Sequence, residues 1–282
     1  MAGDSAKKIK GRIRSIKSTG QITKAMGMVS ASKLRRAQQR ALLARPYCET
    51  LYHVIHRIVD TNAMADSPFL RQSIDKKVLY IVIGADRGLA GGYNSNILKF
   101  SLSKMQEKKA SVFAVGKKIG NYYRKRGVTD NSFSSLDIAS ISLGDCFTVA
   151  KKICDQFLAN RYDAVYLCYS KCVSALSQVP VCKQLLPLSV EKNEGEGVCA
   201  KDTLYDPSGT QVFEVVVPEY LAGVLYGALC ESCASEHAAR RTAMDAATQN
   251  ANEMITQLQL QVNRKRQAAV TQQIAEIISA SQ

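Results

Sequence analysis

The sequence predicts an α/β fold: a long antiparallel coiled coil of the N- and C-terminal helices, with an inserted small doubly wound, Rossmann-like α/β domain. Three observations predict it. Residues 1–45 are patterned as one helix, without a proline before Pro46. Residues 211–281 are patterned as a second helix. Between them, apolar strands alternate with helices, which indicates a mostly parallel sheet. We place the domains at residues 1–65, 66–206 and 207–282.

The N-terminal helix is predicted from the spacing of its apolar residues. They recur every three or four positions as Ile9, Ile13 and Ile16, then Ile22, Met26 and Val29, then Leu34, Ala37 and Ala41. Gly20 and Gly27 each cost about 1 kcal/mol relative to alanine, which is tolerable where a partner approaches closely. An apolar seam with cations on most other faces describes a helix with one packing partner and another surface left for contacts.

The middle of the chain carries the strands. Residues 77–84 (KVLYIVIG) form a continuous apolar run, as expected of a strand buried on both faces. The glycine-rich loop at 86–92 follows it. Further helices are expected at 93–108, 117–126 and 143–160, and further strands at 110–116, 163–169 and 180–188.

The C-terminal helix repeats the three-to-four spacing along its length, through Leu221, Leu225, Leu229, Met244, Ala247, Ala251, Met254, Leu258, Val262, Val270, Ile274 and Ile277. Seventy residues at 1.5 Å each span roughly 100 Å. A head of about 140 residues measures only some 35–40 Å across, so most of this helix should project from it. Its tip, residues 268–282, holds one charged residue, Glu276, which favours a close-fitting sleeve over open solvent.

Charge points to an acidic partner. The first 45 residues carry twelve lysines and arginines and one acid, a net +11 of the chain's +14. Such a helix suits nucleic acid, anionic lipid or acidic protein. Charge alone favours nucleic acid and acidic protein about equally, although no aromatic residue precedes Tyr47 for base stacking.

Cysteine usage and the polar N-terminus indicate a reducing cytoplasm. The nine cysteines are odd in number and irregularly spaced, and residues 1–11 are too polar for a secretory signal. The longest apolar run, residues 78–85, is far short of the roughly twenty residues that span a bilayer. We therefore expect a soluble chain, able to sit against a membrane complex, with neutral free thiols.

No motif predicts catalysis, a cofactor or a metal site. The loop at 84–92 sits where doubly wound folds bind ligands, but it lacks both glycine-rich phosphate-binding patterns. A structural or protein-contact turn is the better interpretation. Cys230 and Cys233 form a single pair on a helix, which favours packed thiols. His53 and His56 share a helix face without a third ligand.

Longer motifs connect the chain to a known family. They are residues 9–13 (IKGRI), 21–26 (QITKAM), 28–34 (MVSASKL), 86–94 (DRGLAGGYN), 204–207 (LYDP), 235–250 (SEHAARRTAMDAATQN) and 263–272 (NRKRQAAVTQ). In this order they closely resemble the gamma subunit of F-type ATP synthases. The resemblance extends over essentially the whole chain.

The resemblance implies a central-stalk rotor without catalytic residues or cofactors. Its partners would be the ring of alpha and beta subunits, the epsilon subunit and the membrane c-ring. Proton or sodium flow through the c-ring would turn it and drive ATP synthesis, or the reverse. It would be a peripheral membrane protein at the cytoplasmic face of the cell membrane, and the acidic lever of beta would replace nucleic acid as the partner of the basic helix.

The resemblance also implies contact residues. Those facing beta would be Lys24, Met26, Asp86, Arg87, Gly88, Ala90, Arg266 and Gln267. Those facing the c-ring and epsilon would be Leu204, Tyr205 and Asp206, and the bearing tip would be Val270, Ile274 and Ile277.

Two departures and two alternatives accompany this interpretation. Ala90 stands where the family more often has cysteine, and the plant-type insertion with its regulatory dithiol is absent, so thioredoxin control is not expected. The first alternative is a non-rotary coiled-coil scaffold that binds an acidic protein or nucleic acid and functions without stoichiometric ATPase subunits. The second is a nucleotide-dependent enzyme, which would turn over as the isolated chain.

Overall fold

The computed structural model describes residues 2–60, 67–70, 77–105, 109–130, 132–133, 138, 141–174, 177–188, 206 and 208–280. It divides into two compact units, one made of Met1–Ala31 with Arg240–Gln282 and the other of Ser32–Ala239. The three consecutive domains predicted from the sequence, residues 1–65, 66–206 and 207–282, stay a prediction.

The two terminal helices are present. Helix α1 spans Ala2–Asp60, and helix α5 spans Gly209–Ala280. Each contains one proline, Pro46 in α1 and Pro218 in α5. A proline inside a helix removes one backbone hydrogen bond, so packing along the rest of each helix must offset that loss.

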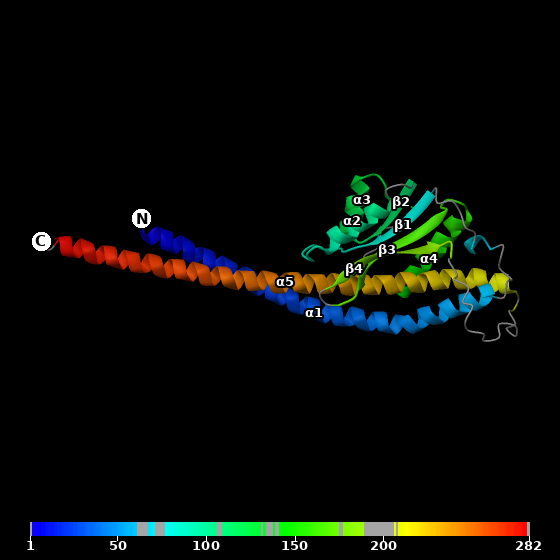
Figure 1. The fold of residues 1–282 in the computed structure, drawn as a ribbon, viewed down its shortest axis with the longest axis horizontal. Helices are drawn as coiled ribbons and strands as arrows, with labels where there is room; N and C mark the ends of the chain where they lie inside the picture. The colour runs from blue at the N-terminus through cyan, green and yellow to red at the C-terminus, as the bar shows by residue number, and fades with distance from the viewer. Residues whose placement is uncertain are drawn as a thin grey trace. The chain divides into compact units, whose positions relative to one another are not determined.

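In the first unit the two helices pair antiparallel, in a register set by small residues. The Thr23 and Thr248 hydroxyls lie 2.7 Å apart, and a Cβ built on Gly20 would lie 3.3 Å from the Cβ of Ala251. Both pairs of residue numbers sum to 271, which puts Ala2 level with residue 269. Helix α5 therefore continues about three turns beyond the start of α1, as the red end of α5 shows in Figure 1.

The seam of this helix pair is narrower than the sequence pattern indicated. Ile9, Ile13 and Ile16 are half-buried, as is Met26. The other two members of the second stripe, Ile22 and Val29, are 59% and 56% exposed. These two residues lie on the outer side of α1, because Gly20, Thr23 and Gly27 form the closest contact with α5.

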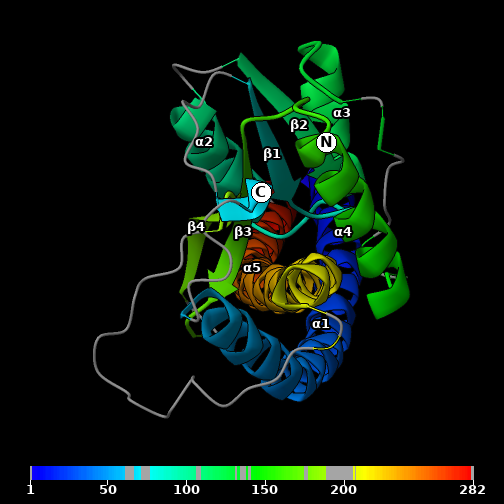
Figure 2. The same ribbon diagram turned by 90° about the vertical axis from the view of Figure 1, so that its right-hand side faces the viewer.

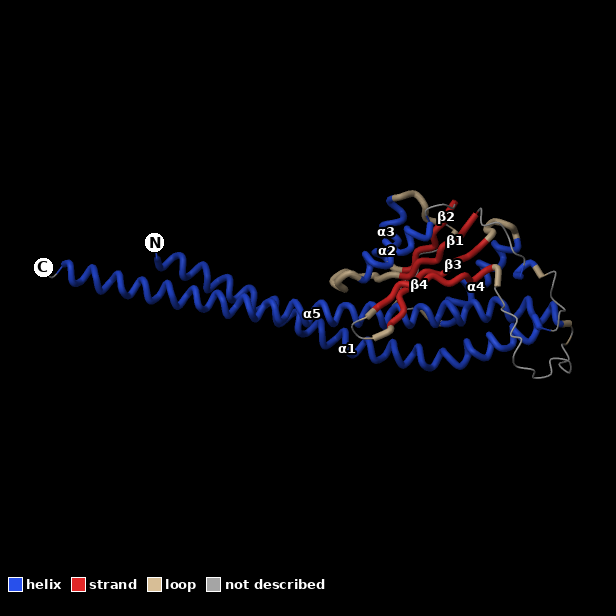
Figure 3. Tube along the Cα trace, viewed as in Figure 1, coloured by secondary structure: helices blue, strands red, loops and turns tan. Residues whose placement is uncertain are grey.

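The second unit contains a four-stranded sheet in the order β2-β1-β3-β4. The strands are β1 at Lys77–Ile83, β2 at Lys109–Val115, β3 at Ala164–Cys172 and β4 at Gln178–Leu186. Strand β1 is parallel to both β2 and β3, whereas β4 is antiparallel to β3 and forms an edge of the sheet, drawn in red in Figure 3.

Helices cover both faces of the sheet. The short ones are α2 at Tyr93–Met105, α3 at Lys117–Lys125 and α4 at Leu143–Leu158, with a 3-10 turn at Pro68–Leu70. Alternate residues of β1 divide between two cores. Val78, Tyr80 and Val82 pack towards α2 and α3. The next residues along, such as Leu79, pack into the core that α4 and the long helices share. Figure 2 shows these elements in an end view.

Helix α5 contains an 18-residue window of mean hydropathy 1.5, which by length and composition alone would suit a membrane span. Half of that window is buried inside the protein. This is the behaviour of a core helix, and residues such as Phe213, Val217 and Leu221 belong to the main core of the second unit.

Candidate partner-binding surfaces

The turn after β1 is held to the sheet by its first residues. The Gly84 N–H donates to the Val115 carbonyl at 2.9 Å, and the Ala85 N–H donates to the Asn94 side chain at 2.9 Å. A Cβ on Gly84 would lie 2.0 Å from the Cγ1 of Ile119, so no other residue fits without displacing that side chain. The turn is therefore a fixed feature of the carboxyl edge of the sheet.

The Asp86 carboxylate is used within the chain. It accepts hydrogen bonds from the Lys117 N–H at 3.0 Å and the Ile138 N–H at 3.2 Å. The N-cap position of α3, Gly116, provides no side-chain cap and has φ +106°. Asp86, which lies 31 positions before Lys117 in the chain, thus supplies the hydrogen-bond acceptor and the negative charge that a helix N-terminus favours. Its predicted contact with beta stays a prediction, but positioning α3 is a role that the geometry gives it directly.

The remaining residues of the turn divide into outward and inward ones. Arg87 and Gly88 are exposed, and Leu89 is 64% exposed with φ +62°. Ala90 is 3% exposed and packs with Tyr93 and other residues of a small cluster. Arg87 and Leu89 are therefore the side chains of this turn that are accessible to a partner, whereas burial of the Ala90 side chain does not favour its predicted contact with beta. Leu89 is not among the contact residues predicted from the sequence, although a large apolar residue in a glycine-rich turn was a signal for an exposed apolar side chain.

Helix α5 is anchored to the α/β fold of the second unit by buried hydroxyls. The Tyr93 and Ser232 hydroxyls lie 2.7 Å apart, and the Ser235 hydroxyl donates to the Ser170 carbonyl at 2.8 Å. Burial raises the pKa of Tyr93, so its phenol stays protonated. Two buried bonds from one helix to two parts of the sheet domain restrict rotation of that helix about its own axis.

The predicted contact residues of the helix pair lie mostly on its surface. Lys24 is exposed and Met26 half-buried on α1, and Arg266 and Gln267 are exposed on α5. The bearing-tip residues Val270, Ile274 and Ile277 are 49%, 53% and 69% exposed. The last three lie on the part of α5 that extends past α1, so they have apolar surface available for a partner.

The predicted contact with the c-ring and epsilon is described only at Asp206, which is exposed. Leu204 and Tyr205 lie outside the described residues.

A basic pocket lies in the second unit. It has a volume of about 230 Å³ and is lined by Lys33, Arg36, Arg40, His237, Cys230, Cys233 and apolar residues. Burial raises the pKa of Cys233 to about 11, so the thiol remains protonated near neutral pH. Within the described residues, no group of three histidine, cysteine or acidic side chains could hold a metal ion. Packed thiols remain the interpretation of Cys230 and Cys233.

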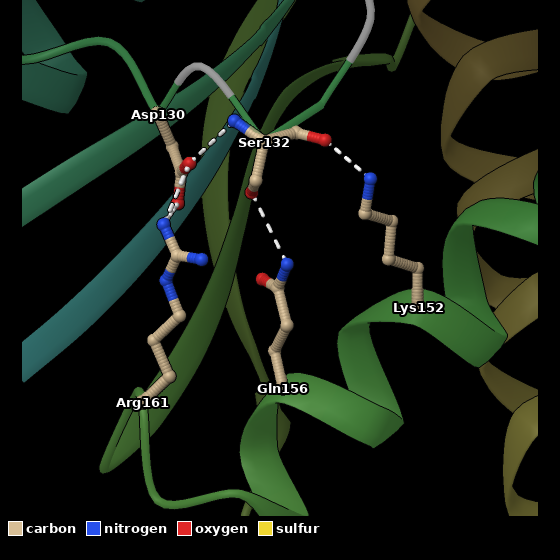
Figure 4. A network of polar contacts seen from close by, with 5 residues as sticks. All are labelled: Asp130, Ser132, Lys152, Gln156 and Arg161. Carbon is tan, nitrogen blue, oxygen red and sulfur yellow. Dashed lines mark hydrogen bonds and ion pairs between the residues drawn. The ribbon is translucent and has the colours of Figure 1, made fainter.

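A polar network fixes the segment after α3 against α4 (Figure 4). Asp130 accepts from the Ser132 N–H at 2.8 Å and pairs with Arg161 at 3.2 Å. The Gln156 amide donates to the Ser132 hydroxyl at 3.1 Å, and Lys152 donates to the Ser132 carbonyl. Every one of these side chains has a partner within the network, which gives it a structural role in the α/β fold.

Comparisons with known proteins agree with one another. A family model described as ATP synthase matches residues 5–282. The ATP synthase gamma chain of Pelotomaculum thermopropionicum is 41% identical over 280 residues, covering 98% of both chains. That of Geobacter metallireducens is 40% identical over 283 residues, covering 99% of this chain and 98% of its own.

Solved structures are similar in fold. The rotor of the Euglena gracilis mitochondrial ATP synthase aligns with TM-score 0.65 at 19% identity, over 95% of this chain and 99% of its own. A chain from the central stalk and c-ring of the Tetrahymena thermophila mitochondrial enzyme aligns with TM-score 0.61 at 22% identity, over 80% of this chain and 99% of its own.

Proposed function

Because the chain belongs to the gamma-chain family of ATP synthases, we propose that it is the central-stalk rotor of an F-type ATP synthase. Ion flow through the c-ring turns it, and its rotation drives ATP synthesis at the alpha and beta subunits, or runs in reverse during hydrolysis. The chain itself is non-catalytic. It works at the cytoplasmic face of the cell membrane as a peripheral subunit, with epsilon as a further partner.

One observation in the structure supports this function best. Helix α5 continues about three turns beyond α1, and three apolar side chains near its end, Val270, Ile274 and Ile277, are 49%, 53% and 69% exposed. Among the residues that the structure describes, these three side chains lie past the start of α1. A ring of subunits that encloses the tip would cover this surface, and a bearing is a contact that tolerates rotation because it lacks charge pairs.

The contacts with beta are proposed at two levels of the chain. On the helix pair, Lys24, Arg266 and Gln267 present polar groups outward. On the second unit, Arg87 and Leu89 are the exposed side chains of the turn. The cations Lys24 and Arg87 would attract the acidic lever of beta, in exposed pairs that are weak enough to break once in every turn. Arg266 and Gln267 would form the polar catch on a catalytic subunit.

Rotation tests the proposal directly. The native cysteines are replaced, Lys125 at the exposed end of α3 is changed to cysteine, and a bead is attached there. The chain is assembled with alpha and beta subunits fixed to a surface. ATP should then turn the bead in one direction. ATP hydrolysis at the full rate with a stationary bead, in molecules whose bead attachment has been verified, would exclude the rotary function.

Composition of the native assembly separates this function from a static scaffold. We expect one copy of this chain for three alpha and three beta subunits. A stable complex without ATPase subunits would favour the scaffold.

Calorimetry of the isolated chain should show no micromolar ATP binding, because the turn after β1 lacks a phosphate-binding pattern.

A further inference from the structure

Two cysteines face each other across the β3–β4 hairpin. Cys168 on β3 and Cys182 on β4 are directly opposed in the antiparallel register. Their sulfur atoms are 3.4 Å apart, with the Cys168 thiol donating to the Cys182 sulfur. Directly opposed residues of an antiparallel pair have Cβ atoms about 4.5–5.5 Å apart, so a small local movement brings two such sulfurs into bonding distance.

We propose that Cys168 and Cys182 form a redox site, in which a peroxide oxidises the two thiols to a reversible disulfide that ties the edge strand β4 to β3. The site is independent of the rotary function, since it lies within one hairpin. It also differs from a regulatory dithiol in an inserted loop, because both sulfurs sit on strands of the sheet.

The positions of the two thiols assign the first step to Cys182. Cys168 is fully buried beneath α2, whereas Cys182 is half-buried on the edge strand, where a small oxidant arrives first. A hydrogen bond donated by Cys168 stabilises the thiolate of Cys182. Its hydrogen bond to Cys182, together with burial, raises the pKa of Cys168, so Cys168 stays protonated until its partner has been oxidised.

The chemistry balances with hydrogen peroxide as the oxidant. The Cys182 thiolate attacks one oxygen, an S–O bond forms, the O–O bond breaks and hydroxide leaves with a proton from the medium as water. The resulting sulfenic acid is then attacked by the Cys168 sulfur. The S–S bond forms, the S–O bond breaks, and the second hydroxide takes the Cys168 proton. Two thiols and one peroxide give one disulfide and two waters.

The structural consequence is confined to the sheet edge. Among the described strands, β4 is an edge strand with β3 as its neighbour, so its backbone opens more easily than that of the central strands β1 and β3. A disulfide between directly opposed residues closes a short loop and limits this opening. Oxidation should therefore slow hydrogen exchange of the β4 amides while leaving the parallel strands β1 and β2 unchanged.

The experiment uses the assembled complex and differential thiol labelling. The complex is treated with low hydrogen peroxide, free thiols are blocked with one maleimide, disulfides are reduced, and the released thiols are labelled with an isotopically heavy maleimide. We expect the heavy label on Cys168 and Cys182 together and not on Cys154. Cys154 is the control, because it is also buried and its pKa is also raised, to about 12.

Serine variants test the order of the two steps. In Cys168→Ser, a sulfenic acid should persist at Cys182 and react with dimedone. In Cys182→Ser, Cys168 should remain reduced under the same treatment. In the unmodified chain, oxidation should slow β4 amide exchange by about tenfold or more, and dithiothreitol should reverse it. If the two thiols stay reduced, or are oxidised no faster than Cys154, the redox site is refuted.

Discussion

Replacing Asp86 separates a structural function of this carboxylate from a contact with beta. It accepts hydrogen bonds from the Lys117 N–H at 3.0 Å and the Ile138 N–H at 3.2 Å. A hydrogen bond to a charged group contributes about 1.5–3 kcal/mol. Because Asp86 is half-buried and one bond is long, we expect Asp86→Ala to cost about 2–3 kcal/mol in total. The α3 N-terminus would lose its acceptor and would fray.

Hydrogen exchange measures this loss at the affected amide. A change of 1.4 kcal/mol is tenfold in an equilibrium constant, so a loss of about 2–3 kcal/mol should make the Lys117 amide exchange roughly 30- to 140-fold faster in Asp86→Ala. Asp86→Asn keeps one acceptor oxygen, so its Lys117 amide should exchange at a rate between those of the unmodified chain and Asp86→Ala. Arg87→Ala, at the exposed neighbouring position, is the matched control and should change stability by less than about 0.5 kcal/mol. Unchanged Lys117 exchange together with reduced ATPase turnover would show that Asp86 acts through beta.

Three further predictions concern the partner contacts. Gly88→Cys, whose new Cβ would meet no atom within 4 Å, should cross-link on oxidation to a cysteine in the acidic lever of beta and stop ATP hydrolysis until reduced. The control is Ala90→Cys, which should cross-link much more slowly because this position is buried. ATP hydrolysis at the full rate in a cross-linked Gly88→Cys complex would contradict rotation of this turn past beta. Arg266→Ala should remove a charge-assisted hydrogen bond of about 1.5–3 kcal/mol and lower coupled turnover, without changing thermal unfolding of the chain. The effect of Lys265→Ala on turnover should be milder. Normal ATP hydrolysis in both assembled variants refutes the contact. Met26→Lys should lower the ratio of ATP synthesis to hydrolysis, because the added cation forms an ion pair with beta that resists rotation. Met26→Leu is the control and should keep the wild-type ratio. Equal ratios in the two variants speak against this contact.

Local patterns predicted the elements better than their pairing. The uninterrupted apolar run at β1 indicated a strand buried on both faces, and residues Val78–Ile83 are all buried. The antiparallel direction of β4 was missed, although a signal was present. About ten residues separate the two expected strands, and a parallel crossover needs a dozen or more. The turn in which Val173 N–H donates to the Ser177 carbonyl makes the short connection.

The functions of individual turn residues were not readable from the sequence, because their partners are distant along the chain. Asp86 reaches amides that lie 31 and 52 positions further on. Ala90 packs near Ala239, which is the last residue of the second unit. A family motif records which residues are kept together, but it does not record whether a side chain faces a partner or its own fold.

The narrow seam of the first unit explains how so basic a helix packs at all. A wide apolar stripe on α1 would leave less of its circumference for the lysines and arginines that precede Ser32. Gly20, Gly27 and Thr23 instead let the helices approach closely, with a Cβ on Gly27 only 3.1 Å from the Asp245 carboxylate. Each glycine costs about 1 kcal/mol of helix stability, which dispersion between closely packed backbones offsets. The outer faces then remain free for cations, so the same pair of helices holds together and still presents charge to a surrounding ring.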